Sequence, residues 1–101
     1  MTEQLNAFFG AMSDPTRRAV IERLVHGPAS VSALHEGHAM ALPTFLRHLK
    51  VLEATGIVQS RKSGRVRTCH LDPGALIEVQ GWLAWQRHIW ENRPEELSAA
   101  E

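Results

Sequence analysis

The sequence predicts a mainly α-helical domain that carries one small β-hairpin. Apolar residues recur at helical spacing in several segments, prolines and glycines mark the ends of these segments, and one pair of β-capable runs flanks a Ser-Gly dipeptide. The chain has 101 residues, of which 44% are hydrophobic, and this length and composition are typical of a globular domain. We therefore expect residues 1–101 to fold as a single domain.

The first two helices are predicted from an apolar stripe and a capping pair. Over residues 3–12 the apolar side chains follow the spacing of one helix face, and they are Leu5, Phe8, Phe9 and Met12. Asp14 and Pro15 mark the start of a helix over residues 15–26, because aspartate accepts bonds from free N–H groups and proline suits the first helical position. Glycine and proline at positions 27 and 28 end it. Its expected buried residues are Ala19, Val20, Ile21, Leu24 and Val25.

Two further helices are separated by a short turn. Ser30 caps the first, over residues 30–36, which Gly37 ends. Its inward residues are Val31 and Leu34. The second covers residues 42–55, with Pro43 in its first turn and Gly56 after its end. Its expected buried face is Phe45, Leu49 and Leu52, and its opposite face is Thr44, Leu46, Arg47 and Lys50.

A hairpin and a last helix complete the chain. The β-capable runs 57–61 and 66–71 flank a turn at residues 62–65. Asp72-Pro73 then begins a helix over residues 73–92, which Pro94 interrupts or ends. The order helix, helix, helix, turn, helix, hairpin, helix is that of a winged helix-turn-helix. We assign the helix-turn-helix to residues 30–56 and the wing to residues 57–71.

The charges of the chain are unevenly distributed, although they sum to zero. Between Thr44 and His70 there are six basic residues and one acidic residue, Glu53, whereas the rest of the chain holds five basic and ten acidic residues. Such segregation favours a polyanionic partner on one segment. The alternative is a solvated hairpin with scattered cations.

Helix 42–55 has the two faces that a helix in a DNA major groove requires, an apolar back and a polar front. We expect Arg47 to contact a guanine and Lys50 a phosphate. The hairpin cations can follow the backbone or enter the minor groove, although Arg67 can instead pair with Glu53 or Asp72. The predicted DNA-binding residues are Ser30, Ser32, Pro43, Thr44, Leu46, Arg47, His48, Lys50, Arg61, Lys62, Arg65 and Arg67.

The last helix carries an apolar stripe broader than one small domain can cover. With the stripe of the first helix it would form a continuous layer between two subunits, so residues 1–12 and 73–93 are the expected dimerisation helices. The alternative is that all three tryptophans pack within one chain. The predicted interface residues are Leu5, Phe8, Phe9, Met12, Leu76, Val79, Trp82, Leu83, Trp85, Ile89 and Trp90.

Other classes of protein lack support in the sequence. No run reaches the ~20 apolar residues of a membrane span, and the N-terminus has no basic start or apolar stretch of a secretion signal. The single cysteine, Cys69, excludes an internal disulfide and is expected to be a small buried hydrophobe rather than a redox switch. With no phosphate loop or nucleophile–base pair, the chain is not expected to be an enzyme, and the cytoplasm is the expected compartment.

Several runs, taken together, resemble the ArsR-type winged helix-turn-helix transcriptional repressors over residues 5–93. These runs are Asp14-Pro15-Thr16-Arg17-Arg18, residues 30–34, residues 47–58, Gly64-Arg65 and Leu71-Asp72-Pro73. Residues 82–91 resemble the closing helix of a subgroup that lacks the usual metal-sensing cysteines. The resemblance implies a homodimeric repressor that binds a double-stranded DNA operator near its own promoter, with its first and last helices at the dimer interface.

The chain departs from the family pattern at two positions of the reader helix. The family often has serine near positions 41 and 46, where this chain has Ala41 and Leu46. Ala41 cannot cap the helix with its side chain. Leu46 replaces a possible polar contact by an apolar one, which can touch a thymine methyl, so the operator is expected to differ from those of relatives.

Metal sensing is the main alternative within the family. Its metal-responsive members carry a Cys-x-Cys motif in the short helix, where this chain has no cysteine, and a second site in the last helix, of which only His88 and Glu91 are matched. His35 and His38 form a further pair. Because a closed zinc site needs four ligands, we expect no metal, no cofactor and an unidentified inducing signal. A winged-helix module that docks a protein partner through its tryptophans is the alternative from another class.

Overall fold

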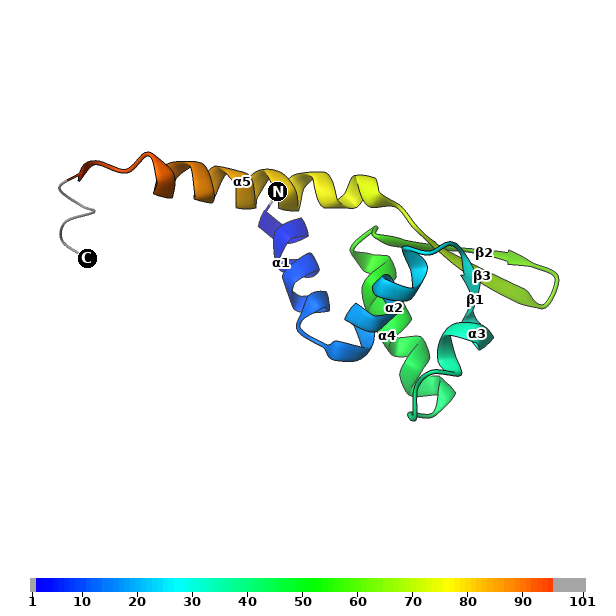
Figure 1. Ribbon diagram of the computed structural model, residues 1–101. Helices are drawn as coiled ribbons and strands as arrows, with labels where there is room; N and C mark the ends of the chain where they lie inside the picture. The colour runs from blue at the N-terminus through cyan, green and yellow to red at the C-terminus, as the bar shows by residue number, and fades with distance from the viewer. Residues whose placement is uncertain (1, 96–101) are drawn as a thin grey trace.

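The computed structural model describes residues 2–95 and contains the expected elements in the expected order (Figure 1). The α-helices are α1 (Thr2–Met12), α2 (Pro15–Leu24), α3 (Val31–His35), α4 (Leu42–Ala54) and α5 (Ile77–Glu91). The strands are β1 (Ala29–Ser30), β2 (Val58–Ser63) and β3 (Val66–Leu71), and a 3-10 helix, η1 (Pro73–Leu76), leads into α5. The fold is thus mainly helical with a small antiparallel sheet, as predicted.

The helix starts follow the capping residues that the sequence predicts. The Asp14 carboxylate accepts the N–H of Arg17 at 3.0 Å, and the Ser30 hydroxyl accepts the N–H of Ala33 at 3.1 Å. The Asp72 carboxylate accepts the N–H of Gly74 at 3.1 Å, which here begins η1 rather than a continuous α-helix. Helix α4 begins after Ala41 without a side-chain cap, so its first turn relies on Pro43 and on packing.

The core lies between α2, α3, α4 and the sheet. Phe45, Leu49 and Leu52 of α4 are buried, which confirms the predicted inner face. The buried residues that surround them are Ala11, Val20, Leu24, Ala29, Leu34, Ile57, Val58 and Cys69. The prediction that Val25 is buried was wrong: α2 ends at Leu24, and the Val25 side chain is 63% exposed.

The sheet has three strands in the order β1-β3-β2, and all neighbours are antiparallel. Strand β1 was not predicted; its two residues pair with Cys69 and Thr68 of β3 and so attach the start of α3 to the base of the wing. Strand β2 also extends to Ser63, beyond the predicted end at residue 61. The turn is therefore only Gly64-Arg65, with Gly64 at φ +61°, where glycine avoids the strain of a Cβ atom.

Helix α5 extends away from this body (Figure 1). The radius of gyration is 17.5 Å, whereas a compact chain of this length has about 13 Å. Helix α5 contacts α1, where the Phe9 and Trp82 rings lie edge to face at 5.9 Å. Every side chain from residue 80 to residue 92 is exposed. Within residues 2–95, no helix is long and apolar enough to cross a membrane.

Candidate nucleic-acid interface

Helix α4 presents a mixed polar and apolar face opposite its buried one. Because successive residues of an α-helix are about 100° apart, Arg47 lies about 200° from the buried Phe45 and so projects away from the core. Arg47 is exposed, as are Pro43, Leu46 and Lys50, and Thr44 is half-buried on the flank. The predicted outward face of the reader helix is thus accessible.

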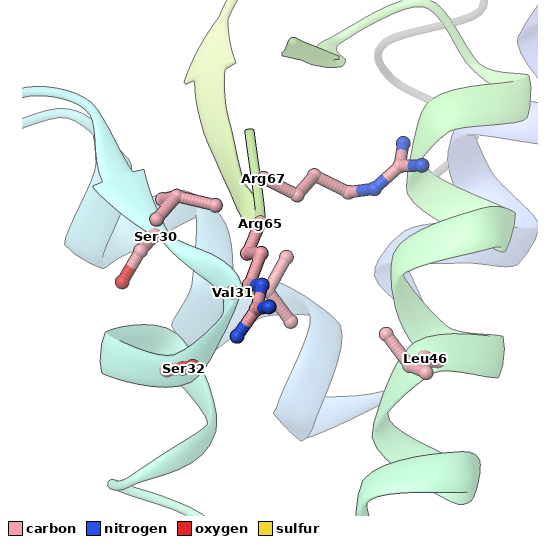
Figure 2. Close-up of a pocket in the computed structure, with 7 residues that line it drawn as sticks. Ser30, Val31, Ser32, Leu46, Arg65 and Arg67 are labelled. Carbon is pink, nitrogen blue, oxygen red and sulfur yellow. The ribbon is translucent and has the colours of Figure 1, made fainter. Parts of the chain in front are cut away.

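A hollow separates this helix from the wing. Figure 2 shows Leu46 of α4 on one side and, on the other, Arg65 and Arg67 of the wing beside the start of α3. The residues that line it are Ser30, Val31, Ser32, Leu46, Arg65, Val66 and Arg67. An adjoining hollow is lined by Leu46, Leu49, Lys50, Glu53 and Arg67. Five of the predicted DNA-binding residues, from β1, α3, α4, β3 and the hairpin turn, therefore surround one depression.

The cationic side chains of the wing are exposed and not neutralised by nearby acids. They are Arg61, Lys62, Arg65 and Arg67. Within the part of the chain that the structure describes, none of them forms a salt bridge. Arg67 donates to the Ser60 hydroxyl at 3.0 Å, and Asp72 accepts from the Gln59 amide at 3.1 Å. The alternative pairing of Arg67 with Glu53 or Asp72 is therefore wrong, and the wing keeps its positive charge.

His48 occupies a different flank of α4 from the rest of the predicted DNA-binding set. Its Nδ1 lies 3.0 Å from Nη1 of Arg17 and 3.8 Å from the Asp14 carboxylate. Since an arginine only donates, Nδ1 of His48 is the acceptor in this pair. The backbone N–H of Arg17 lowers the pKa of the Asp14 carboxyl; partial burial opposes this shift, and the Arg17 guanidinium reinforces it. His48 is therefore a contact between α4 and α2.

Arg17 is a positioning residue that the sequence reasoning missed. Its Nε donates to the Ala11 carbonyl at 2.7 Å and its Nη2 to the Gly10 carbonyl at 3.2 Å, so it joins the end of α1 to His48 of α4. A signal for this role exists in the sequence. Arg17 lies in the first turn of α2, where the helix dipole disfavours a cation, and a tertiary contact offsets that unfavourable position.

Apart from Val79, the predicted dimer residues fall into two groups. Phe9 of α1 and several residues of α5 are exposed: Trp82, Leu83, Trp85, Ile89 and Trp90. The others are partly covered within the chain: Leu5, Phe8, Met12 and Leu76. Val79 is only 4% exposed, so its prediction as an interface residue needs correction: it packs inside one chain and has almost no surface to bury against another.

The residues considered as metal ligands have other contacts. Nε2 of His35 lies 2.7 Å from the Met40 carbonyl, and the rings of His35 and His38 each lie 5.2 Å from that of Phe45. His88 is stacked on Trp85 at 5.5 Å, and Glu91 is exposed on the same helix. Among residues 2–95, no three histidine, cysteine or acidic side chains are grouped as a metal site requires.

Comparison with known proteins identifies relatives across most of the chain. Residues 12–61 match a family model described as a helix-turn-helix domain. The chain is 42% identical over 70 residues to the HTH-type transcriptional regulator Rv2034 of Mycobacterium tuberculosis. The matched segment covers 69% of this chain and 65% of that protein. It is 25% identical over 79 residues to the transcriptional repressor SdpR of Bacillus subtilis, with 78% and 88% covered. The crystal structure of an ArsR family transcriptional regulator is 48% identical and matches with a TM-score of 0.89, over 93% of this chain and 97% of the other.

Proposed function

Because the chain belongs to the ArsR family of winged helix-turn-helix transcriptional regulators, which are DNA-binding proteins and not enzymes, we propose that it is a homodimeric repressor of a double-stranded DNA operator. The observation that carries this proposal is the accessible face of α4 beside a wing whose four cations have no salt-bridge partner among residues 2–95. A B-DNA major groove about 12 Å wide admits one such helix.

The contacts follow from the chemistry of each side chain. Arg47, at the outermost position of α4, suits a bidentate bond to guanine. Lys50, one turn later, suits a phosphate, as do Ser30 and Ser32 on the rim of the hollow. The wing cations would follow the backbone or enter the neighbouring minor groove. We leave His48 out of the contact set, because its ring bonds to Arg17.

The homodimer is supported by the exposed apolar face of α5. Trp82, Leu83, Trp85, Ile89 and Trp90 span about 160° of the helix circumference at 100° per residue. A face this wide on a helix that extends from the body is expected to bury itself against a second copy, together with Phe9 of α1. Two-fold symmetry would then place two reader helices about 34 Å apart, one turn of DNA.

Repression, rather than activation, is supported by the likeness to the repressor SdpR. We propose that the chain acts in the cytoplasm, where it represses its own promoter. A dimer seated on an operator blocks a promoter by occupancy alone, so this action needs no second domain.

Selection from a random library of double-stranded DNA tests the proposal. We expect enrichment of a two-fold symmetric site with half-sites one helical turn apart, and a fluorescence anisotropy titration whose affinity falls steeply as salt rises. If the selection enriches no sequence and the affinity for DNA does not change with salt, DNA recognition is contradicted. A protein partner for the tryptophan face is then favoured.

Replacement of Arg65 by alanine tests the wing. We expect binding to the selected site and to unrelated DNA to weaken by a similar factor. The slope of log affinity against log salt should flatten by about 0.9 per protomer, because the variant makes one phosphate contact fewer and so releases fewer counterions on binding. Arg87→Ala, an exposed change on α5, should leave the slope unchanged. An unaltered slope for the Arg65 variant would remove the wing from the DNA contacts.

A further inference from the structure

Leu46 has a position and a chemistry that the general proposal does not explain. It is on the wing side of the outward face of α4, and its side chain is 40% exposed. Its neighbours in the outward direction, Arg47 and Lys50, are polar, as a groove-reading surface requires. The leucine beside them carries no hydrogen-bonding group, so among the chemical groups of a groove it can gain only from an apolar one. Leu46 is also not an isolated apolar residue, because Val31 and Val66 line the same hollow.

The hollow beside Leu46 has both apolar and polar lining residues, and the polar ones are called its rim below. Leu46, Val31 and Val66 supply the apolar part, and Val66 and Leu46 are both exposed. The rim consists of two hydroxyls and two guanidinium groups, those of Ser30, Ser32, Arg65 and Arg67, which are labelled in Figure 2. This rim fits phosphate oxygens, which accept from hydroxyls and guanidinium groups. A DNA strand held by the rim would therefore pass close to Leu46.

A pyrimidine of that strand offers Leu46 one apolar group. In the major groove, thymine presents its C5-methyl group, whereas cytosine presents an amino donor and the purines present N7 acceptors. A leucine facing those polar groups would remove their water and give no hydrogen bond in return, which is unfavourable. It would gain only from the methyl group.

We propose that Leu46 is a specificity-determining residue that selects a thymine in each operator half-site through its C5-methyl group. This inference rests on the proposed DNA-binding function and names the base that the reader helix prefers on its wing side. Arg65 and Arg67 hold the strand, and Leu46 reads it.

The test replaces thymines of the selected operator, one symmetric pair at a time, by deoxyuridine, which lacks only the methyl group. For the unaltered protein we expect one thymine pair whose replacement weakens binding by about fourfold per methyl group removed. This is the effect of losing the burial of one apolar carbon. In Leu46→Ala the same replacement should have no effect. Leu46→Met, which keeps an apolar side chain of similar size, should retain the loss.

A matched control lies on the opposite flank of the same helix. Val51 is exposed to a similar degree, and its alanine variant should keep the full sensitivity to deoxyuridine. Thermal melts of each variant establish that it folds. A selected operator in which no thymine is sensitive, or sensitivity that survives in Leu46→Ala, overturns the inference while DNA binding stands. Failure to select any DNA overturns the proposed function, and the inference with it.

Discussion

Replacing Ile89 by glutamate is expected to turn the protein into a monomer and to lower its affinity for the selected operator by at least about 100-fold. Ile89 is 49% exposed in the middle of the apolar face of α5, seven positions after Trp82, whose ring meets that of Phe9 of α1. Across a two-fold axis the change buries two unpaired carboxylates, one from each chain. Loss of the dimer also removes the gain from engaging both half-sites at once, which reaches 10²–10⁴.

The measurement is light scattering, with anisotropy on full and half operators. The unaltered protein should have about twice the 11.3 kDa of one chain, and the Ile89 variant about that of one chain. Ala84→Glu adds the same charge to an exposed position of the same helix, but about 140° from Ile89, on the opposite side from the apolar face. It should remain a dimer. A dimeric Ile89 variant with full operator affinity would place the subunit contact elsewhere.

Replacing Arg47 by alanine is expected to weaken binding to the selected operator by about 5- to 150-fold for each half-site, which corresponds to the ~1–3 kcal/mol of a bidentate contact to a base. Binding to unrelated DNA should change little, because that binding depends on phosphate contacts. The side chain is exposed and forms no salt bridge with residues 2–95, so the melting temperature should stay the same.

Two controls separate base reading from charge. Arg23→Ala removes an exposed arginine from α2 and should leave operator affinity unchanged. Arg47→Lys keeps the charge but loses the planar two-donor geometry, so it should bind unrelated DNA normally and the operator poorly. Equal losses on operator and unrelated DNA would identify Arg47 as a phosphate contact instead.

The parts of the fold that sequence predicts well are those decided by neighbouring residues. The caps at Asp14, Ser30 and Asp72 depend on a side chain and a backbone group two or three residues apart. The inner face of α4, from Phe45 to Leu52, follows from a repeat of 3.6 residues over about two turns. Such signals lie within one short window, so the sequence alone is sufficient to find them.

The parts that it misses depend on contacts between distant segments. Strand β1 has only two residues, too few for any alternation, and exists because Ala29 meets Cys69 of β3. Val25 follows the apolar repeat but lies beyond the last turn of α2, where no other element covers it. His48 was assigned by its place on the reader helix, yet the arginine that bonds it lies 31 positions earlier.

The residues of the candidate site can be proposed from the sequence, but their arrangement in space cannot. Local charge and spacing selected the α4 and wing residues without a partner structure. The hollow itself depends on how the wing base, α3 and α4 pack together, so Val31 and Val66 entered it only with the three-dimensional structure. Val79 is buried whereas residues 80–92 of α5 are exposed, because the helix extends past the rest of the fold after Val79. This difference likewise depends on the three-dimensional structure.

The buried cysteine has a practical consequence. Cys69 is 0% exposed in the central strand β3. Burial raises the pKa of its thiol; the negative charge of Glu53 adds to this shift, and the positive charge of Arg67 opposes it. As the single cysteine of the chain, it reacts with an alkylating reagent only when the core packed against β3 opens. The labelling rate in native buffer thus reports the opening of this part of the core, and a bound ligand that stabilises it would slow that chemistry.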